Sequence, residues 1–227
     1  MINVSTNLKK IFHKDSQFLF IIIYYSFFCG EIKDGKMKKI ILFASGSGSN
    51  AENIIKYFQE KKTAEVVAVF SNNPEAKVLE KASNLKVSTY IFTKEDLNAG
   101  KVLHKTNEFR PDLIVLAGFL LKFPEDIVAA YPNKIINIHP ALLPKYGGKG
   151  MYGMNVHRKV LENKDSHSGI SIHFVNENYD EGAMIFQTEV LVENCQTPEE
   201  IAEKVQELEH IHFPLIIEKI IKQTFLI

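Results

Sequence analysis

Short apolar runs that alternate with helix-like stretches are the feature that most limits the fold of this chain. From residue 37 onward, four runs rich in Ile and Val are each followed by turn residues and then an amphipathic stretch: KKIILFA, AEVVAVFS, LIVLAG and KIINI. Strands buried on both faces have continuous apolar runs, and parallel strands need a crossover helix between them. The pattern therefore predicts an α/β, Rossmann-like fold, in which a mostly parallel sheet has helices on both faces.

The intervening stretches predict the helices and the last strands. Helices are expected at residues 49–61, 74–83, 95–109 and 124–131, and a longer one from Thr197-Pro198 to about Glu209, with proline at its first position and acids in its first turn. Two later apolar runs, SGISIHFVN and AMIFQTEVLV, are separated only by ENYDEG, which is too short for a crossover helix. These C-terminal strands are expected to join the sheet as antiparallel or edge strands.

The first 36 residues differ in character from the rest. An apolar run at residues 18–29 follows three lysines and resembles the hydrophobic region of a signal peptide. It is shorter than the roughly 20 residues that span a bilayer, and no small-x-small cleavage site follows. A cleaved signal and a genuine tail remain open, but the immediate strand MKKIILFA favours Met37 as the true start. We predict a non-domain extension at residues 1–36 and one domain at residues 37–227.

Composition narrows the classes of partner. Lys+Arg 27 against Asp+Glu 27 gives no net charge, so a nucleic-acid-binding balance is not indicated. The two cysteines, Cys29 and Cys195, have no metal-ligand or C-x-x-C spacing, which argues against structural zinc and a disulfide scaffold. We expect a cytoplasmic protein with small-molecule substrates, no nucleic acid, no stable membrane association, and a monomeric or homodimeric state.

A glycine-rich loop joins the first strand to the first helix. The stretch FASGSGSNAENII places Gly46 and Gly48 where backbone N–H groups and the helix dipole can hold a phosphate. A dinucleotide fingerprint fails at its third glycine, replaced by Ala51, and no Walker Gly-Lys-Ser/Thr follows. We predict a phosphomonoester at Gly48, Ser49 and Asn50. The alternative is a tight turn in which Ser49 caps the helix.

Polar side chains stand at the carboxyl end of KIINIH, where a buried strand should end. Asn137 and His139 project to the same side of that strand, at the edge where open α/β sheets bind ligands. One amide and one imidazole aimed at a single point can stabilise an oxyanion, although a buried histidine beside an asparagine turn is equally open. Asp180, in NENYDEGAM, is by default a turn residue between two strands.

Two other stretches also allow two interpretations. The apolar loop 119–123 follows LIVLAG and could be the pocket of a flat ligand or part of the core. Gln206, Glu209 and His210 share one face of the last helix by their spacing, which a solvated face would also show.

The motifs GSGSN, LAGF, INIHPALLPKY, SGISIHFV followed by YDEGAMIFQ, and VQELEHIHFP, in this order and spacing, closely resemble the phosphoribosylglycinamide formyltransferase family over about residues 37–222. The resemblance implies the formyltransferase fold and transfer of a formyl group from 10-formyltetrahydrofolate to the amine of 5'-phosphoribosylglycinamide in purine synthesis, without metal or ATP. It implies catalytic roles for Asn137, His139 and Asp180. The other implied contacts are Gly48, Ser49 and Asn50 for the substrate phosphate, Gln206 and Glu209 for the rest of the substrate, and Lys94, Leu120, Leu121, Lys122, Phe123 and Asn137 for the folate.

Departures and competing functions qualify this resemblance. KGMYGMNV makes the loop before HRKVLEN longer than in the shorter family members, and Asn155 stands where some members have histidine. Formyltetrahydrofolate hydrolases normally carry an extra N-terminal regulatory domain, and methionyl-tRNA formyltransferases a C-terminal domain that helps hold tRNA. A non-enzymatic nucleotide-binding module would leave Asn137, His139 and Asp180 without a purpose.

Overall fold

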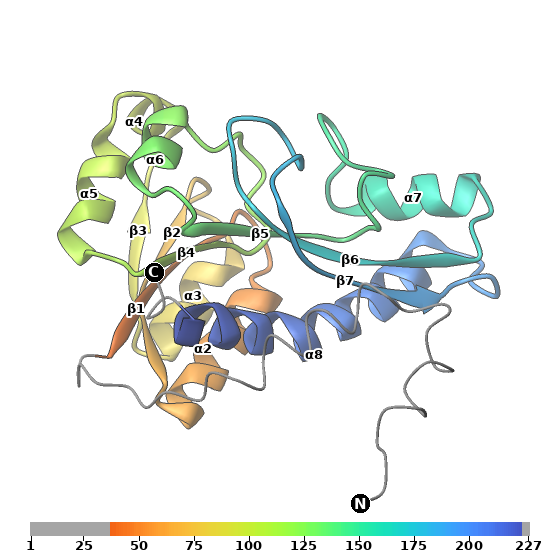
Figure 1. The fold of residues 1–227 in the computed structure, drawn as a ribbon, viewed down its shortest axis with the longest axis horizontal. Coiled ribbons are helices and arrows are strands. Elements are labelled where there is room, and N and C mark those ends of the chain that lie inside the picture. Colours follow the sequence, from red (N-terminus) through yellow and green to blue (C-terminus); the bar gives the residue numbers. More distant parts are fainter. Residues whose placement is uncertain (1–36, 224–227) are drawn as a thin grey trace, which may run out of the picture. The chain divides into compact units, whose positions relative to one another are not determined.

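A computed structural model describes residues 37–223, so the extension at residues 1–36 and the interpretations offered for it lie outside the described residues. Helices flank a central sheet (Figure 1). The elements in chain order are β1 (Lys38–Phe43), α2 (Ser49–Lys61), β2 (Ala64–Ser71), α3 (Lys77–Asn84), β3 (Ser88–Ile91), α4 (Lys94–Asn98), α5 (Lys101–Phe109), β4 (Leu113–Leu116), α6 (Glu125–Ala130), β5 (Ile135–His139), α7 (Met154–Glu162), β6 (His167–Phe174), β7 (Met184–Leu191) and α8 (Pro198–Gln223).

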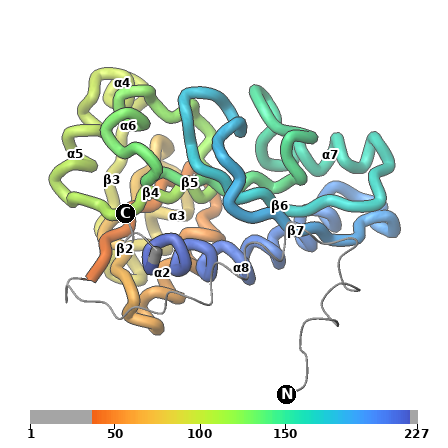
Figure 2. Tube along the Cα trace, viewed as in Figure 1, coloured from red at the N-terminus to blue at the C-terminus, as the bar shows by residue number. Residues whose placement is uncertain are grey.

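Within residues 37–223 the strands form one seven-stranded sheet in the order β3-β2-β1-β4-β5-β6-β7. The strands from β3 to β5 are parallel to their neighbours, whereas β6 pairs antiparallel with β5 and β7 antiparallel with β6. The trace in Figure 2 follows the raised loop, residues 175–183, that joins β6 to β7. The predicted fold class is confirmed, including the antiparallel C-terminal strands.

Alternating residues of β1 build two separate apolar cores. Ile40 and Leu42 are fully buried in a core shared with α2, α3 and α8. Ile41 and Phe43, which point the other way, are fully buried in a second core with α4, α5 and α6. A strand covered by helices on both faces needs apolar side chains at every buried position, which explains the unbroken run IILF at residues 40–43.

The helices differ from the sequence prediction at several boundaries. The helix expected at 95–109 is divided into α4 and α5, because Gly100 adopts a left-handed conformation with φ 73°. The helix expected at 74–83 begins only at Lys77, and the one at 124–131 is shortened to α6. Neither β3 nor α7 was predicted from the sequence.

The last helix continues well beyond Glu209 and passes through Pro214. A proline inside a helix has no N–H to donate to the carbonyl four residues earlier, here that of His210. The side-chain amide of Asn53 on α2 donates to this carbonyl instead, at 2.8 Å. The vacant acceptor is thereby satisfied by a neighbouring helix, and α8 continues.

The strand order reverses between β1 and β4. The chain moves outward from β1 to β2 and β3, then crosses back to β4 and β5 on the other side of β1. The loops that leave β1 and β4 diverge at such a point, and a crevice forms at the carboxyl ends of the strands. Sheet topology therefore places the glycine loop and the apolar loop 119–123 on opposite sides of one opening.

Candidate active site

A cleft of about 850 Å³ lies at the carboxyl ends of β1, β4 and β5. Its walls come from the glycine loop, the loop after β4, the end of β5, the loop 148–154, the β6–β7 hairpin and one face of α8. Every residue predicted for the site lines this cleft except Lys94. Lys94 is exposed at the first position of α4, and its contact with folate stays a prediction.

A single carboxylate, that of Asp180, gathers four polar groups in the cleft. The backbone N–H of Gly148 donates to its Oδ2 at 2.9 Å. The Nδ2 of Asn137 lies 3.5 Å from Oδ1, the Nδ1 of His139 lies 3.7 Å from Oδ2, and the Nε2 of His173 lies 3.6 Å from Oδ1. The structure thus brings the three predicted catalytic side chains together.

The antiparallel pairing of β5 with β6 explains how these residues meet. Asn137 stands directly opposite His173 in the register, and their side chains touch at 3.2 Å. The hairpin that follows β6 returns Asp180 over this pair. A Cβ at Gly182 would lie only 1.7 Å from the backbone oxygen of Phe174, so the hairpin can close this tightly only with glycine there.

The orientation of the His139 ring follows from its hydrogen bonds. Its Nε2 lies 2.7 Å from the carbonyl oxygen of Tyr146. A carbonyl can only accept, so we assign the proton to Nε2, which leaves Nδ1 facing Asp180. Burial lowers the pKa of His139 below its usual value, while the negative charge of Asp180 and the Tyr146 carbonyl act in the opposite direction. The resting imidazole is mainly neutral at pH 7, beside a charge that favours its protonation.

The carboxyl of Asp180 is kept ionised by its surroundings. Burial acts to raise its pKa, but the nearby His173, the positive charge that His139 carries when protonated and the N–H of Gly148 together hold the pKa below its usual value. His173 in turn lies 2.8 Å from the carbonyl oxygen of Phe174 through Nδ1, so we assign its proton there. Asp180 is therefore a carboxylate able to accept a proton within the cleft.

The glycine loop ends in a helix start suited to an anion. Gly48 is the N-cap of α2, with φ 69°, and no side chain caps the helix. The first N–H groups of a helix have no partner within it and carry the positive end of the dipole. The alternative in which Ser49 caps the helix is wrong, because Ser49 is the first helical residue and its hydroxyl accepts a hydrogen bond from Gln206 at 2.8 Å.

A second contact joins α8 to the start of α2. The side-chain amide of Asn50 donates to Glu209 at 2.7 Å, and burial raises the pKa of Glu209 to about 6 against the effect of this hydrogen bond. The Oδ1 of Asn50 is buried with no hydrogen-bond partner in the structure. A buried acceptor without a partner is costly, so this atom is suited to a donor group of a bound molecule.

The loop after β4 forms an apolar wall of the cleft. Phe123 is buried and its ring contacts those of Phe43 and Phe119, with centroids 5.0 and 5.9 Å apart. Leu120 stays 47% exposed, while its backbone N–H is held by the hydroxyl of Ser45 at 3.1 Å. Leu121 and Lys122 complete this side of the lining. The wall is anchored in the core yet presents apolar surface to the opening.

Several groups of the candidate site were missed by sequence reasoning. His173 lies in SGISIHFV, but its place opposite Asn137 depends on a strand register that spacing alone does not reveal. The N–H of Gly148 and the carbonyl of Tyr146 act through the backbone, which leaves no mark on side-chain patterns.

His157, on the unpredicted α7, also lines the cleft. It is buried, its Nδ1 has no partner, and burial lowers its pKa to about 4, with the nearby His139 adding to the effect.

Residues 37–223 contain neither a candidate metal site nor a candidate membrane-spanning helix. No group of three or more His, Cys, Asp or Glu side chains in that part of the chain is arranged to hold a metal ion. None of the helices described there is both long and apolar enough to cross a membrane.

Several known proteins with similar sequences are named phosphoribosylglycinamide formyltransferase. The formyl transferase family matches residues 38–217. The phosphoribosylglycinamide formyltransferase of Escherichia coli (strain K12) is 36% identical over 184 residues, covering 78% of this chain and 84% of that protein. The chloroplastic phosphoribosylglycinamide formyltransferase of Arabidopsis thaliana is 37% identical over 188 residues, covering 80% of this chain but only 64% of that protein.

Solved structures agree with the sequence matches. The crystal structure of phosphoribosylglycinamide formyltransferase from Brucella melitensis has a TM-score of 0.74 and 34% identity, covering 82% of this chain and 96% of that one. The crystal structure of glycinamide ribonucleotide transformylase 1 from Symbiobacterium toebii has a TM-score of 0.77 and 28% identity, covering 85% of this chain and 92% of that one.

Proposed function

The chain belongs to the formyl transferase family, and we propose that it transfers the formyl group of 10-formyltetrahydrofolate to the amine of 5'-phosphoribosylglycinamide, a step of purine synthesis. The observation that carries this proposal is the meeting of Asn137, His139 and Asp180 in one cleft, between an anion-binding helix start and an apolar wall. The names of the relatives point to the same reaction.

The cleft has a suitable place for each part of the two substrates. The phosphate fits the start of α2, at Gly48, Ser49 and Asn50, where backbone N–H groups lack helical partners. Gln206 and Glu209 both make hydrogen bonds to the start of α2, so they lie beside that position. We propose that they bind the sugar. This end of the cleft is polar and matches a polar acceptor.

The formyl donor fits the opposite wall. Its flat ring system needs an apolar surface, which Leu120, Leu121 and Phe123 supply. Lys122 is exposed at the rim, and Lys94 lies outside the cleft lining. We propose that these two lysines contact the charged tail of the donor, which for Lys94 requires the tail to extend beyond the cleft.

The transfer exchanges one carbon–nitrogen bond for another. The acceptor amine attacks the formyl carbon, and a tetrahedral carbon with an oxyanion forms before the folate nitrogen leaves. The amide of Asn137 and the protonated Nδ1 of His139 both face the region of Asp180 and can donate to this oxygen. Burial makes the protonated form of His139 unfavourable in the resting site. The neighbouring carboxylate of Asp180 stabilises that protonated form as negative charge develops on the oxyanion.

Proton transfer completes the exchange. The attacking nitrogen loses a proton and the leaving folate nitrogen gains one, so no net proton is consumed. We propose that the carboxylate of Asp180, whose pKa is below its usual value, accepts and returns this proton, directly or through one water. The formyl donor is already activated, so we expect the reaction to require neither ATP nor a metal ion.

The experiment that tests this function is an assay of purified protein with 10-formyltetrahydrofolate, with and without phosphoribosylglycinamide. We expect loss of the formyl donor only when the acceptor is present, and loss of nearly all activity in His139→Ala. Donor consumption without acceptor would identify a hydrolase. A protein that binds the ligands but consumes no donor in either assay would be a binding module.

Oligomeric state and cellular location stay predictions. We expect a monomer or homodimer, which sedimentation of the purified protein would determine. The cysteine content predicts a cytoplasmic location, whereas two of the relatives are named as chloroplastic proteins. Direct localisation of the tagged protein would decide between the two locations.

A further inference from the structure

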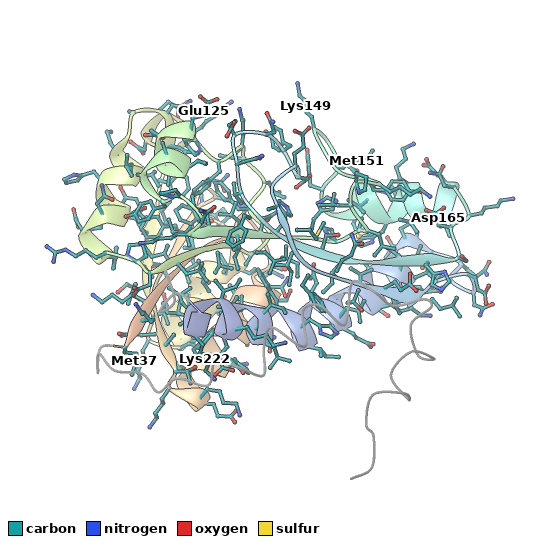
Figure 3. All side chains as sticks on the ribbon, viewed as in Figure 1. Met37, Glu125, Lys149, Met151, Asp165 and Lys222 are labelled. Carbon is teal, nitrogen blue, oxygen red and sulfur yellow. The ribbon has the colours of Figure 1, made fainter. Side chains whose placement is uncertain are left out.

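Tyr146 contacts the candidate site through its backbone and a separate polar cluster through its side chain. Its carbonyl oxygen accepts the hydrogen bond from His139 at 2.7 Å. Its hydroxyl lies 2.6 Å from Asp165 and 2.6 Å from the side-chain amide of Asn163, and Lys145 contacts both oxygens of Asp165 at 2.7 Å. Figure 3 shows Asp165 beyond the end of α7, near the start of β6.

The backbone of Tyr146 is in an unfavourable conformation. Its φ of 59° lies in the left-handed region, which bulky side chains rarely adopt. Such a conformation persists only where the surroundings hold it in place. The hydrogen bonds of the Tyr146 hydroxyl to Asp165 and Asn163 are the contacts that fix the far end of this side chain.

The polar cluster lies outside the cleft. Lys145, Tyr146 and Asp165 line a separate cavity of about 220 Å³, and none of the three lines the 850 Å³ cleft. Their side chains therefore do not touch a molecule bound in the cleft. Any effect on catalysis must pass through the carbonyl of Tyr146 and the ring of His139.

We propose that Tyr146 is a positioning residue, which Lys145, Asn163 and Asp165 hold so that its carbonyl fixes the His139 ring with Nε2–H turned away from the reaction. Since the carbonyl can only accept, it selects the proton position that leaves Nδ1 toward Asp180. This inference rests on the proposed function, because it gives His139 its donor role there. The titratable groups around His139 are Asp180, His173 and His157, and none belongs to the cluster.

Tyr146→Phe tests the proposal because it removes only the hydroxyl. We expect kcat to fall roughly 10-fold with both KM values within about two-fold of wild type, since a slightly misplaced catalytic group slows chemistry more than it weakens binding. The matched control is Tyr131→Phe, which removes a hydroxyl 2.6 Å from Asn107 at a place that does not line the cleft. Its kcat should equal that of wild type.

A second readout does not depend on activity. Nitrogen NMR of the histidine rings should show His139 with its proton on Nε2 in the wild type and a mixture of the two neutral forms in Tyr146→Phe. If the wild type transfers no formyl group, the proposed function fails while this spectrum still tests the positioning. An unchanged spectrum, or a kcat for Tyr146→Phe equal to that of Tyr131→Phe, would overturn the inference.

A second pair of variants covers the case in which Tyr146→Phe does not fold. Asp165→Asn keeps an acceptor for the Tyr146 hydroxyl, whereas Asp165→Ala removes it. We expect kcat to be several-fold higher in Asp165→Asn than in Asp165→Ala, at similar melting temperatures. Equal kcat values in the two would show that the hydroxyl contact does not position His139.

Discussion

At the scale of single residues, Asp180 combines two roles that the sequence presents as alternatives. Its φ of 55° is a left-handed conformation, which aspartate and asparagine adopt more readily than most residues, so it is a turn residue. Its carboxylate also contacts Asn137, His139 and Gly148 in the cleft. The backbone role places the carboxylate, and the carboxylate then performs the chemistry that we propose.

The substitution Asp180→Asn separates these two roles. Asparagine tolerates the same backbone and can still accept the N–H of Gly148, so the melting temperature should change little. If the carboxylate handles protons, kcat should fall roughly 10²–10⁴-fold while both substrates still bind. Because the charge of Asp180 acts to raise the pKa of His139, its loss should lower that pKa and move the alkaline limb of the kcat profile to lower pH.

The measurement is kcat against pH for wild type and Asp180→Asn, with a thermal melt of each. Glu177→Gln, an exposed change in the same hairpin, is the control and should leave the profile unaltered. A folded Asp180→Asn protein that keeps more than a tenth of wild-type kcat would leave Asp180 with a turn role alone.

Gly48 has a role in packing that is separate from the phosphate contact predicted for it. The glycine pattern suggests room for a phosphate, but a Cβ at Gly48 would also lie 2.4 Å from the side chain of Val78 on α3, and its φ is 69°. A substitution there would disturb the packing of α2 against α3. Gly48 is therefore a poor position at which to test phosphate binding.

Gly46 offers the cleaner test of the phosphate loop. A Cβ there meets nothing within 4 Å, and the residue lines the cleft, so Gly46→Val should fold normally. Its side chain would occupy space beside the helix start. We expect the KM for phosphoribosylglycinamide to rise roughly 10-fold, equivalent to about 1.4 kcal/mol of binding, with little change in the KM for the folate. Steady-state kinetics with each substrate varied in turn decides this, and equal rises in both KM values would contradict it.

At the scale of elements, burial decides what the sequence reveals. β1, β2, β4 and β5 are largely buried and carry continuous apolar runs, so they were predicted. β3 is short and mostly exposed, and its sequence STYI has no such signal. The shared direction of the Asn137 and His139 side chains follows from the two-residue period of a strand. The contributions of His173 and Tyr146 require a strand register and a backbone direction that no local pattern contains.

Helix α8 depends on a contact that its own sequence does not show. Pro214 leaves the carbonyl of His210 without a helical donor, and Asn53 replaces that donor. Asn53→Ala should therefore lower the free energy of unfolding by about 1–3 kcal/mol, because a partly buried acceptor loses its partner. Denaturant unfolding of the purified protein measures this loss.

The double variant provides the control for α8. Pro214→Ala restores a backbone N–H that can donate to His210 within the helix. In that background Asn53→Ala should cost clearly less than in the wild type, and the difference gives the coupling between the two sites. Equal costs in both backgrounds would show that the Asn53 contact does not compensate for the proline.

At the scale of the whole molecule, residues 37–223 contain both apolar cores and the complete candidate site. The match to the formyl transferase family also begins at residue 38. We therefore predict that a protein starting at Met37 keeps a cooperative melting transition and the kcat of the full chain. Thermal melts and assays of the two proteins side by side test this. Loss of cooperative melting on truncation would show that residues 1–36 belong to the folding unit.

Two buried groups of the cleft give the stability of the whole domain opposite dependences on pH. Burial lowers the pKa of His157 from 6.5 to about 4, so between these values the unfolded chain binds more protons and acid destabilises the fold. Burial raises the pKa of Glu209 from 4.5 to about 6, so its contribution is fully present below pH 4.5 and is lost as pH rises through about 6. The two effects partly cancel between pH 4.5 and 6.

Removing His157 should expose the opposing effect of Glu209. In His157→Leu, the fall in unfolding free energy from pH 6.5 to 5 should be smaller than in wild type, because the unfolded state no longer gains a proton at this position. Urea unfolding at several pH values measures that slope. The control is His104→Leu, since His104 is 82% exposed on its side chain and has no comparable burial to lose. A wild-type slope in His157→Leu would mean that this histidine is as easily protonated in the folded protein as in the unfolded chain.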